Sequence, residues 1–353
     1  MKILYGVCGE GYGHSSRALI LADYLEKKGH EVTILTYGRA HKVLKKKFKC
    51  FKVKGLHLIF ENSIIRKRKT IKYNLENFPK NIQKWKKFHK LMKEFNPDLC
   101  ISDMEPIVPI LRNLYQKPLI SFDNQHRLTN LELDIPKKHK QDFLIARTIV
   151  ETFVKKADYF VITAFGKHKI REKHKKNTFL VTPPIRKNVK EIRKNCKYGD
   201  KILVYLTQKD KQRLKTLQKT NEKFVIYGYS KNKKKNNLEF KTTNHFVEDL
   251  KDCKAIISTA GFTLMSEAIY LKKPLLALPL HGQFEQTLNA LLLKKSGFGD
   301  YVEELTEKDL IYFLYNLEKH KKKLKNHNPN PDQLFKTFDK LLKKFGNNRK
   351  INP

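Results

Sequence analysis

Cysteine is scarce in this sequence and follows no pattern. The chain has five among its 353 residues, and no two form a C-x-x-C pair: Cys8, Cys50, Cys100, Cys196 and Cys253. An odd, scattered set argues against a disulfide framework and against a zinc ribbon. We expect these thiols to be small, buried or half-buried side chains.

Long apolar runs are also missing. No stretch approaches the roughly 20 consecutive apolar residues that a membrane-spanning helix needs. The chain enters an apolar strand at residues 2–7 and then meets a glycine turn, where a signal peptide would continue its apolar region. We therefore expect a cytoplasmic protein.

Acidic residues are outnumbered by basic ones. Lys and Arg total 74 against 35 Asp and Glu, a formal net charge of +39. Nucleic acid and an anionic membrane would both be attracted by this charge, and a compositional bias that places lysines on solvated faces is a third explanation. Because the chain has no RNP-type aromatic motif, zinc finger or arginine-dominated stripe, we do not expect nucleic acid. We favour bias as the main cause, with peripheral contact at the inner face of an anionic membrane as a use of the charge.

Short apolar strands alternate with amphipathic segments along most of the chain. Strands are expected at residues 2–7, 31–37, 99–102, 118–123, 159–163, 201–206, 224–227, 255–257 and 274–278. This alternation predicts an α/β protein with parallel sheets and helices on both sheet faces.

A pair of adjacent prolines divides the chain. Proline cannot continue a helix or sit in a central strand, so residues 181–186 are predicted to be a hinge. We expect two Rossmann-like domains, 1–184 and 185–330, followed by a C-terminal helix and basic tail at 331–353.

The most informative stretch lies between residues 255 and 289. A strand leads into the small-residue turn 258–261, and the helix after that turn offers free N–H groups that suit a diphosphate. Glu267 lies more than one turn inside this helix, where its carboxylate can accept hydrogen bonds from a vicinal diol such as a ribose. Gln286 and Asn289 share one face of the next helix. The pattern indicates a nucleotide-sugar site, and an ordinary α/β turn is the simpler alternative.

This stretch resembles the donor-binding half of GT-B glycosyltransferases, and most closely the MurG-like, family-28-type branch. In that branch an S-x-x-G turn precedes a helix whose glutamate binds the donor ribose, and a Q-x-x-N pair contacts the sugar and diphosphate. The resemblance implies donor-binding roles for Thr259, Gly261, Glu267, Gln286 and Asn289, and for Phe246 and Val247 beside the nucleobase. It also implies two Rossmann-like domains whose parallel sheets face each other across a cleft, with the C-terminal helix crossing back to the N-terminal domain.

A glycine motif follows the first strand, from Gly9 through Gly11 and Gly13 to His14. A dinucleotide-binding fingerprint would have glycine at the position of His14 and an acidic residue at the end of the next strand. That strand ends at 36–38 without an acidic residue, so the sequence argues against NAD binding. The motif instead resembles the first glycine loop of MurG-like and monogalactosyldiacylglycerol-synthase-like enzymes. Gly11 and Gly13 are then expected to let the backbone approach the donor.

Two side chains of this loop are candidate bases for an acceptor hydroxyl. A histidine such as His14 can serve as a base near neutral pH or donate a hydrogen bond to phosphate. Glu10 is the second candidate. The simpler alternatives are that His14 caps the following helix and that Glu10 is merely solvated.

Two polar clusters follow neighbouring strands of the first domain. S-D-x-E-P and D-N-Q-H resemble an archaeal and bacterial group of GT-B-like proteins, and their place at the carboxyl edge of a parallel sheet favours ligand binding. We expect acceptor binding by Asp103, Glu105, Asp123, Asn124 and His126, with helix capping and turn formation as the alternative. Two carboxylates without further ligands make a weak metal site, so we predict no metal and no cofactor besides the nucleotide-sugar substrate.

One loop departs from the MurG-like pattern. After the strand at 201–206 that branch has a glycine- and serine-rich loop, but this chain has Thr207-Gln208-Lys209-Asp210. Thr207 could donate its hydroxyl to the donor phosphates and Lys209 a charge, although the backbone cannot approach as closely without glycine.

Together these motifs predict an inverting, metal-independent glycosyltransferase. It would move a sugar from a nucleotide donor, UDP in our expectation, to a lipid-linked or glycan acceptor. Two alternatives stay open: a UDP-sugar epimerase of the same fold that uses His14, Glu10 and His126 as acids and bases, and a non-catalytic basic protein that binds polyanions.

Overall fold

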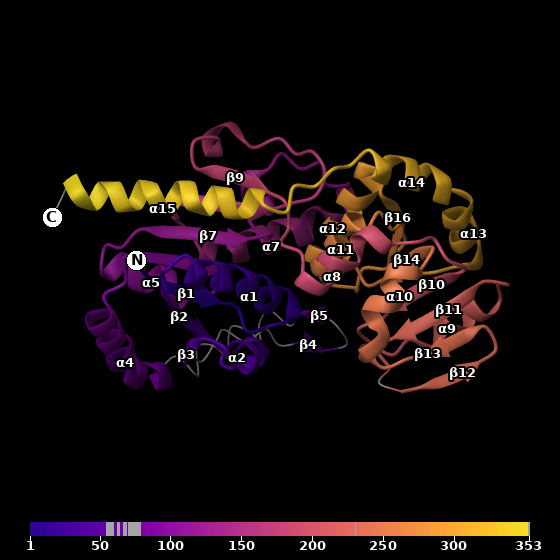
Figure 1. Ribbon diagram of the computed structural model, residues 1–353, viewed down its shortest axis with the longest axis horizontal. Coiled ribbons are helices and arrows are strands. Elements are labelled where there is room, and N and C mark those ends of the chain that lie inside the picture. The colour runs from indigo at the N-terminus through magenta and orange to yellow at the C-terminus, as the bar shows by residue number, and fades with distance from the viewer. Residues whose placement is uncertain (54–59, 62–63, 66–68, 70–78, 230, 352–353) are drawn as a thin grey trace. The chain divides into compact units, whose positions relative to one another are not determined.

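The computed structural model describes all residues except 54–59, 62–63, 66–68, 70–78, 230 and 352–353. The chain forms two compact units: unit 1 comprises Met1–Pro184 with Asn330–Pro353, and unit 2 comprises Ile185–Pro329 (Figure 1). Each unit is built on a seven-stranded sheet, which confirms the predicted architecture of two parallel-sheet α/β domains. Within the described residues, no helix is both long and apolar enough to cross a membrane.

The sheet of unit 1 has the strand order β3-β2-β1-β6-β7-β8-β9, and all neighbouring strands are parallel. Its strands are β1 (Lys2–Val7), β2 (Glu31–Thr36), β3 (Lys49–Lys52), β6 (Leu99–Asp103), β7 (Leu119–Asp123), β8 (Tyr159–Thr163) and β9 (Thr178–Val181). Its helices are α1 (Tyr12–Lys27), α2 (Gly38–Leu44), α4 (Pro79–Phe95), α5 (Ile107–Leu114), α6 (Arg127–Asn130), α7 (Lys140–Phe153) and α15 (Gln333–Ile351). A small antiparallel pair, β4 (Phe60–Glu61) and β5 (Ile64–Ile65), stands outside the sheet.

Both faces of this sheet are covered, as the near-continuous apolar strands require. Alternate residues of β1 enter different cores: Ile3 and Tyr5 pack under α1 and α15, whereas Leu4 packs under α4 and α5. The period of two therefore splits one buried strand between two hydrophobic layers.

The C-terminal helix belongs to unit 1, as expected for a helix that crosses back. Phe338 of α15 is fully buried and meets Phe122 of β7 edge-on, with ring centroids 5.4 Å apart. Phe335 stacks on Tyr24 of α1 at 4.3 Å. Figure 1 shows α15, in yellow, lying along β9 and β7. An apolar stripe on α15 thus closes one face of the sheet.

The sheet of unit 2 has the order β12-β13-β11-β10-β14-β15-β16 and is parallel except for the edge strand β12. Its strands are β10 (Lys201–Tyr205), β11 (Lys223–Tyr227), β12 (Lys233–Lys235), β13 (Leu238–Phe240), β14 (Ala255–Ser258), β15 (Leu275–Ala277) and β16 (Gly299–Tyr301). Its helices are α8 (Lys187–Ile192), α9 (Lys211–Gln218), α10 (Phe246–Asp252), α11 (Phe262–Tyr270), α12 (Phe284–Ser296), α13 (Glu307–Tyr315) and α14 (Leu317–Lys325). Edge strand β12 consists of three exposed lysines, which discourage pairing with another chain.

The structure differs from the predicted elements where strands are short. Strand β9 is not among the predicted strands. It has only four residues and ends at Val181, inside the predicted hinge, just before the two prolines. Helix α1 begins at Tyr12, within the glycine motif rather than after it, since Gly11 turns the chain with a φ of 74°.

Candidate active site at two polar sheet edges

The predicted site residues lie where parallel strands end in both units. In unit 1, Asp103 and Asp123 are the last residues of β6 and β7, and in unit 2, Ser258 is the last residue of β14. The carboxyl edge of a parallel sheet is where α/β folds bind ligands. Each unit therefore offers one candidate edge.

The centre of the unit 1 edge is an ion pair between Asp103 and Arg17 of α1. Arg17 donates from Nε to Oδ2 and from Nη2 to Oδ1 of Asp103, both at 2.6 Å, and from Nη1 to Asn124 Oδ1 at 2.7 Å. Burial alone would lower the pKa of Arg17, but the Asp103 carboxylate raises it above its ordinary value. A bidentate pair of this kind is strong and fixes its geometry. We call His14, Arg17, Asp103, Asn124 and Gln125 the Asp103 network.

His14 is the member of this network that keeps access to solvent, with a side chain 13% exposed. Its Nδ1 lies 2.7 Å from Asp103 Oδ1 and 2.8 Å from Arg17 Nη2. The carboxylate favours a proton on Nδ1, whereas the guanidinium favours an unprotonated Nδ1, so these two contacts indicate opposite tautomers. Gln125 decides between them. Its Oε1 accepts from the Asn124 N–H and from Arg17, which turns its amide nitrogen toward His14 Nε2 at 3.4 Å. Nε2 is then the acceptor, and Nδ1–H donates to Asp103.

Glu105 has a structural role at the start of α5. Its carboxylate is fully buried and accepts hydrogen bonds from the backbone N–H groups of Ile107 and Val108 at 3.1 and 2.9 Å. Gly6 of β1 provides the space, because a Cβ there would lie 2.7 Å from Glu105 Oε2. Burial raises the pKa of Glu105 to about 7 despite the two N–H bonds, which lower it.

Asp123 and His126 form a second buried pair. His126 Nδ1 lies 2.7 Å from Asp123 Oδ2, which also accepts from Ser121 Oγ at 2.7 Å, and His126 Nε2 lies 3.3 Å from the Val154 carbonyl oxygen. Burial would raise the pKa of Asp123, but His126 and these hydrogen bonds hold it well below its ordinary value. With His126 only 2% exposed, the pair braces the loop after β7, and acceptor binding by it stays a prediction.

The glycine motif is locked to the start of α2. Gly9 packs directly on Tyr37, and the Arg39 N–H donates to the Gly9 carbonyl at 3.1 Å. A Cβ on Gly11 would meet nothing within 4 Å, and Glu10 is exposed. The loop therefore presents Glu10, Gly11 and half-buried Gly13 beside His14, which is what close approach by a ligand requires.

The unit 2 edge is built from a tight turn. Gly261 N–H donates to the Thr259 carbonyl at 2.6 Å, and Asn289 of α12 donates from Nδ2 to the Ala260 carbonyl at 2.9 Å. Asn289 is fully buried, so its side chain supports the turn from inside. The hydroxyl of Ser258 is buried and finds no partner among the described residues. Gly261 precedes α11 and gives that helix no side-chain cap.

Glu267 of α11 does not stand alone. Arg186 donates to both carboxylate oxygens, from Nε to Oε1 at 2.6 Å and from Nη2 to Oε2 at 2.7 Å. The Glu267 side chain is 1% exposed and that of Arg186 is 38% exposed. The hydrogen bond to Glu267 raises the pKa of Arg186, and this effect is larger than that of burial, which lowers the pKa. The described bonds use two of the roughly four acceptor positions that a carboxylate has.

The remaining predicted donor residues are spread around this edge. Gln286 Oε1 accepts from the Leu280 N–H at 2.9 Å, which orders the loop before α12. Phe246 meets Tyr205 and Tyr227 edge-on at the start of α10, next to half-buried Val247. Thr207 is exposed after β10.

The loop that contains Thr207 ends in a capped helix. Asp210 Oδ1 accepts from the Arg213 N–H at 2.9 Å and so caps α9. The carboxylate of Asp210 therefore occupies a position that a phosphate would need if it bound the N-terminus of α9. This agrees with the departure of the loop from the glycine-rich pattern.

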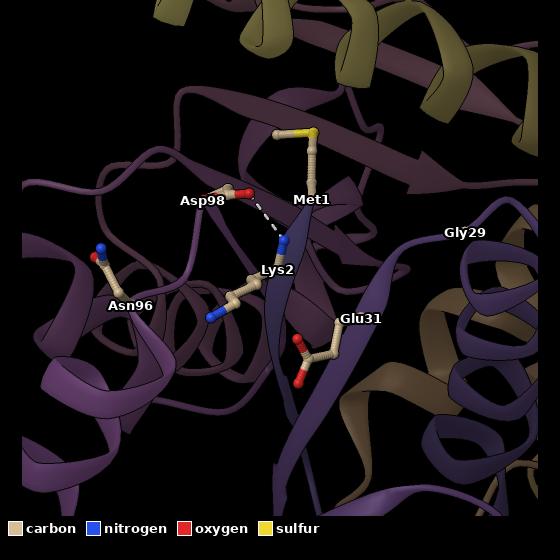
Figure 2. Close-up of a pocket in the computed structure, with 6 residues that line it drawn as sticks. All are labelled: Met1, Lys2, Gly29, Glu31, Asn96 and Asp98. Atoms are coloured by element: carbon tan, nitrogen blue, oxygen red, sulfur yellow. Dashed lines mark hydrogen bonds between the residues drawn. The ribbon is translucent and has the colours of Figure 1, made fainter. Parts of the chain in front are cut away.

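A depression of about 430 Å³ lies at the amino ends of β1, β2 and β6, opposite the Asp103 network; Figure 2 shows its lining, which is Met1, Lys2, Gly29, Glu31, Asn96 and Asp98. Its position at the amino edge makes it a poor ligand site in an α/β fold. In the part of the chain that the structure describes, no group of three or more His, Cys, Asp and Glu side chains could hold a metal ion.

Sequence reasoning overlooked three residues of these sites. Gln125 stands in the D-N-Q-H motif and Arg186 ends the predicted hinge, but neither they nor Arg17 were given a site role, although each makes the contact that fixes a predicted residue. Arg17 and Asp103 are 86 positions apart, and Arg17 is one basic residue among 74. Its spacing of three from His14, which places both on one helix face, is the signal that was available.

This architecture is that of GT-B glycosyltransferases, as comparison with solved structures shows. A Phytolacca americana glycosyltransferase, UGT2, solved with UDP-2-fluoroglucose and pterostilbene, matches with a TM-score of 0.70 and 12% identity over 98% of this chain and 99% of its own. MurG of Acinetobacter baumannii matches with a TM-score of 0.60 and 15% identity over 97% and 99%. The predicted fold class is confirmed.

The chain belongs to glycosyl transferase family 1, whose sequence profile matches residues 1–318. An uncharacterized glycosyltransferase of Methanosarcina acetivorans is 24% identical over 88% of both chains. A second one from the same organism is 35% identical over 105 residues, and there the chain spans only 26% of the relative's length. The prediction of a glycosyltransferase is confirmed at the level of the family.

Proposed function

We propose that this protein is an inverting, metal-independent glycosyltransferase of the MurG-like type that uses a UDP-sugar. The observation that carries the proposal is the Asp103 network, which leaves His14 Nε2 as the acceptor atom of a partly exposed imidazole. An imidazole whose other nitrogen donates to a buried carboxylate is oriented to act as a general base.

In the proposed reaction the acceptor hydroxyl displaces the Gln125 amide, whose nitrogen lies 3.4 Å from His14 Nε2, and gives its proton to that ring nitrogen. The acceptor oxygen attacks the anomeric carbon from the face opposite the nucleotide diphosphate, the bond from that carbon to the diphosphate oxygen breaks, and the configuration inverts. Asp103 stabilises the imidazolium that forms, and Arg17 keeps Asp103 in place. Glu10 remains the second candidate base.

The turn at Ser258 supports the donor half of the proposal. The buried Ser258 hydroxyl has no partner among the described residues, and a diphosphate bound at the start of α11 would supply an acceptor for it. Two acceptor positions of Glu267 are left for the ribose diol, while Arg186 neutralises and orients the carboxylate. Arg186 is thus a positioning residue for Glu267. Phe246, Val247 and Thr207 are proposed to contact the nucleobase and phosphates.

The donor proposal is tested by thermal stabilisation with UDP, GDP, dTDP and ADP and their sugars. A ligand at a hundredfold its dissociation constant should add roughly 2.7 kcal/mol, and Glu267→Gln should abolish most of this. The matched control is Glu318→Gln, which removes the same charge from an exposed position of unit 2. No stabilisation by any nucleotide, together with strong polyanion binding at low salt, would contradict the proposal and favour the non-catalytic alternative.

We further propose peripheral contact with an anionic membrane at its cytoplasmic face and a lipid-linked or glycan acceptor. Helix α13 exposes Ile311, Tyr312 and Tyr315, the last by 87%, and the lysine-rich helix α14 follows it. Exposed aromatic and basic side chains together suit a headgroup region. Tyr312→Ser with Tyr315→Ser should reduce co-sedimentation with phosphatidylglycerol vesicles but leave phosphatidylcholine unaffected; equal binding to both lipids would oppose the idea.

A further inference from the structure

An exposed aromatic ring lies at the start of the helix that carries the candidate base. Tyr12 is the first residue of α1, two positions before His14, and its side chain is 62% exposed. The Arg39 guanidinium lies over this ring, 4.5 Å from the ring centroid. Exposing a large aromatic side chain to water does not stabilise the fold. Contact with a ligand is one reason for an aromatic residue at this position.

The backbone holds the two side chains together. The Arg39 N–H donates to the Gly9 carbonyl, and Gly38, with a φ of 53°, lies so near that oxygen that an added Cβ would be 3.0 Å from it. Helices α1 and α2 also pack against each other. The ring and the guanidinium therefore start from one junction, and their pairing depends on folded structure rather than on two independently mobile loops.

The charge of Arg39 is not neutralised within the described structure. It forms no ion pair there, unlike Arg17 and Arg186, and the first turn of α1 carries no acidic residue. A cation–π contact at an exposed site contributes only about 0.5–1 kcal/mol and leaves the guanidinium N–H groups able to donate. The pair thus combines a flat apolar surface with a positive charge, and Tyr12 belongs to the same first turn of α1 as His14.

We propose that Tyr12 and Arg39 form the acceptor subsite and select acceptors that have an oxyanion, a phosphate or a carboxylate, next to a sugar ring. The C–H face of the sugar stacks on Tyr12. The guanidinium binds the oxyanion by paired, charge-assisted hydrogen bonds, which orients the reacting hydroxyl toward Nε2 of His14. This inference rests on the proposed function, since it takes His14 to be the base.

The test compares three probes on the whole protein by titration calorimetry. They are 4-nitrophenyl β-D-glucopyranoside, its 6-phosphate and 4-nitrophenyl β-D-glucuronide. The wild type should bind one or both anionic probes about tenfold or more tightly than the neutral one, as bonds to a charged group allow. A preference for one of the two identifies phosphate or carboxylate as the group that is selected.

Variants separate this subsite from the general basic charge. Arg39→Ala should remove the anion preference, Arg39→Lys should keep part of it, and Tyr12→Ala should weaken all three probes alike whereas Tyr12→Phe should not. Lys46→Ala, an exposed residue just after α2, removes the same charge and should change nothing. Equal affinity for the three probes, no binding of any, or a preference that survives Arg39→Ala would overturn the proposal.

The nucleotide titration on the same samples keeps the two proposals apart. Every Tyr12 and Arg39 variant should retain the stabilisation by nucleotide that the wild type shows, because Glu267 and the turn at Ser258 lie in unit 2. Failure of all nucleotides on the wild type would count against the proposed function. Normal nucleotide binding with no anion preference would count against this subsite alone.

Discussion

The two candidate edges use polar groups in opposite ways. At the edge of unit 1, charged side chains already satisfy one another: Arg17 is bound by Asp103 on both oxygens, and neither side chain is more than 7% exposed. At the edge of unit 2, the buried Ser258 hydroxyl has no partner among the described residues. The first edge is organised before any ligand arrives, whereas the second has hydrogen-bonding capacity that a ligand would complete.

This difference predicts where each edge is sensitive. Burying an ion pair costs desolvation free energy that its geometry must offset, so removing one partner leaves an uncompensated charge. A buried hydroxyl without a partner already has an unfavourable desolvation free energy, so removing it has little adverse effect on folding. Mutations should therefore damage the stability of unit 1 and the ligand binding of unit 2.

The largest effect should come from Asp103→Asn. This substitution keeps the shape of the side chain but leaves Arg17 charged and buried, and we expect unit 1 to lose about 3–5 kcal/mol. Trp85 is the single tryptophan of the chain and lies half-buried in α4 of unit 1. Urea unfolding followed by its fluorescence therefore reports on this unit.

The control for Asp103→Asn is Glu151→Gln in the same unit. Glu151 pairs with Arg147 at 3.0 Å on an exposed helix face, where such a pair contributes about 0.3–0.5 kcal/mol. Similar losses in the two variants would mean that the Asp103 network is not the buried, mutually satisfied unit described above, and the comparison between the edges would fail.

The contrast between the edges also explains how much could be predicted from the sequence. Buried strands and the turn at 258–261 were recognisable because apolar runs and small residues act locally. The polar residue types at the unit 1 edge were also recognisable. The ion pair of Asp103 with Arg17 and the burial of His126 were not, because those contacts join residues from separate strands and helices. Contact of Asn289 with the sugar stays a prediction, and only the packed structure shows that its Nδ2 donates to the Ala260 carbonyl. Sequence motifs identify candidate groups, whereas tertiary packing decides which of them are already occupied.

A second effect should appear in the pH dependence of unit 1. Burial raises the pKa of Glu105 from 4.5 in the unfolded chain to about 7 in the folded one. The folded state therefore binds more protons between these values, and stability falls as pH rises through this window, by about 3 kcal/mol at 1.36 kcal/mol per pKa unit. Asp123 has the opposite sign, because its folded pKa lies below 3.8 and its contribution is lost only as the solution becomes more acidic.

Glu105→Gln separates the two carboxyl groups. Relative to the wild type, the variant should gain about 3 kcal/mol in unfolding free energy between pH 4.5 and 8, measured by Trp85 fluorescence in urea, because it has no charge to bury. The acid limb set by Asp123 should be unchanged. A wild type and a variant with parallel pH profiles would show that Glu105 is not the group whose ionisation opposes the folding of this edge.

The smallest effect compares two buried serines that end or nearly end a strand. Ser102 of β6 donates from Oγ to the Glu105 carbonyl at 2.8 Å, so Ser102→Ala should destabilise unit 1 by about 1 kcal/mol. Ser258→Ala should leave unit 2 unchanged or slightly more stable, because the hydroxyl has no described partner to lose. Hydrogen exchange of peptides that cover β14 and α11 measures this directly in unit 2.

The Ser258→Ala variant should also lower stabilisation by nucleotide, since the hydroxyl gains its partner only in the complex. Destabilisation of free unit 2 with unchanged nucleotide binding would reverse the assignment and make Ser258 a structural residue like Ser102.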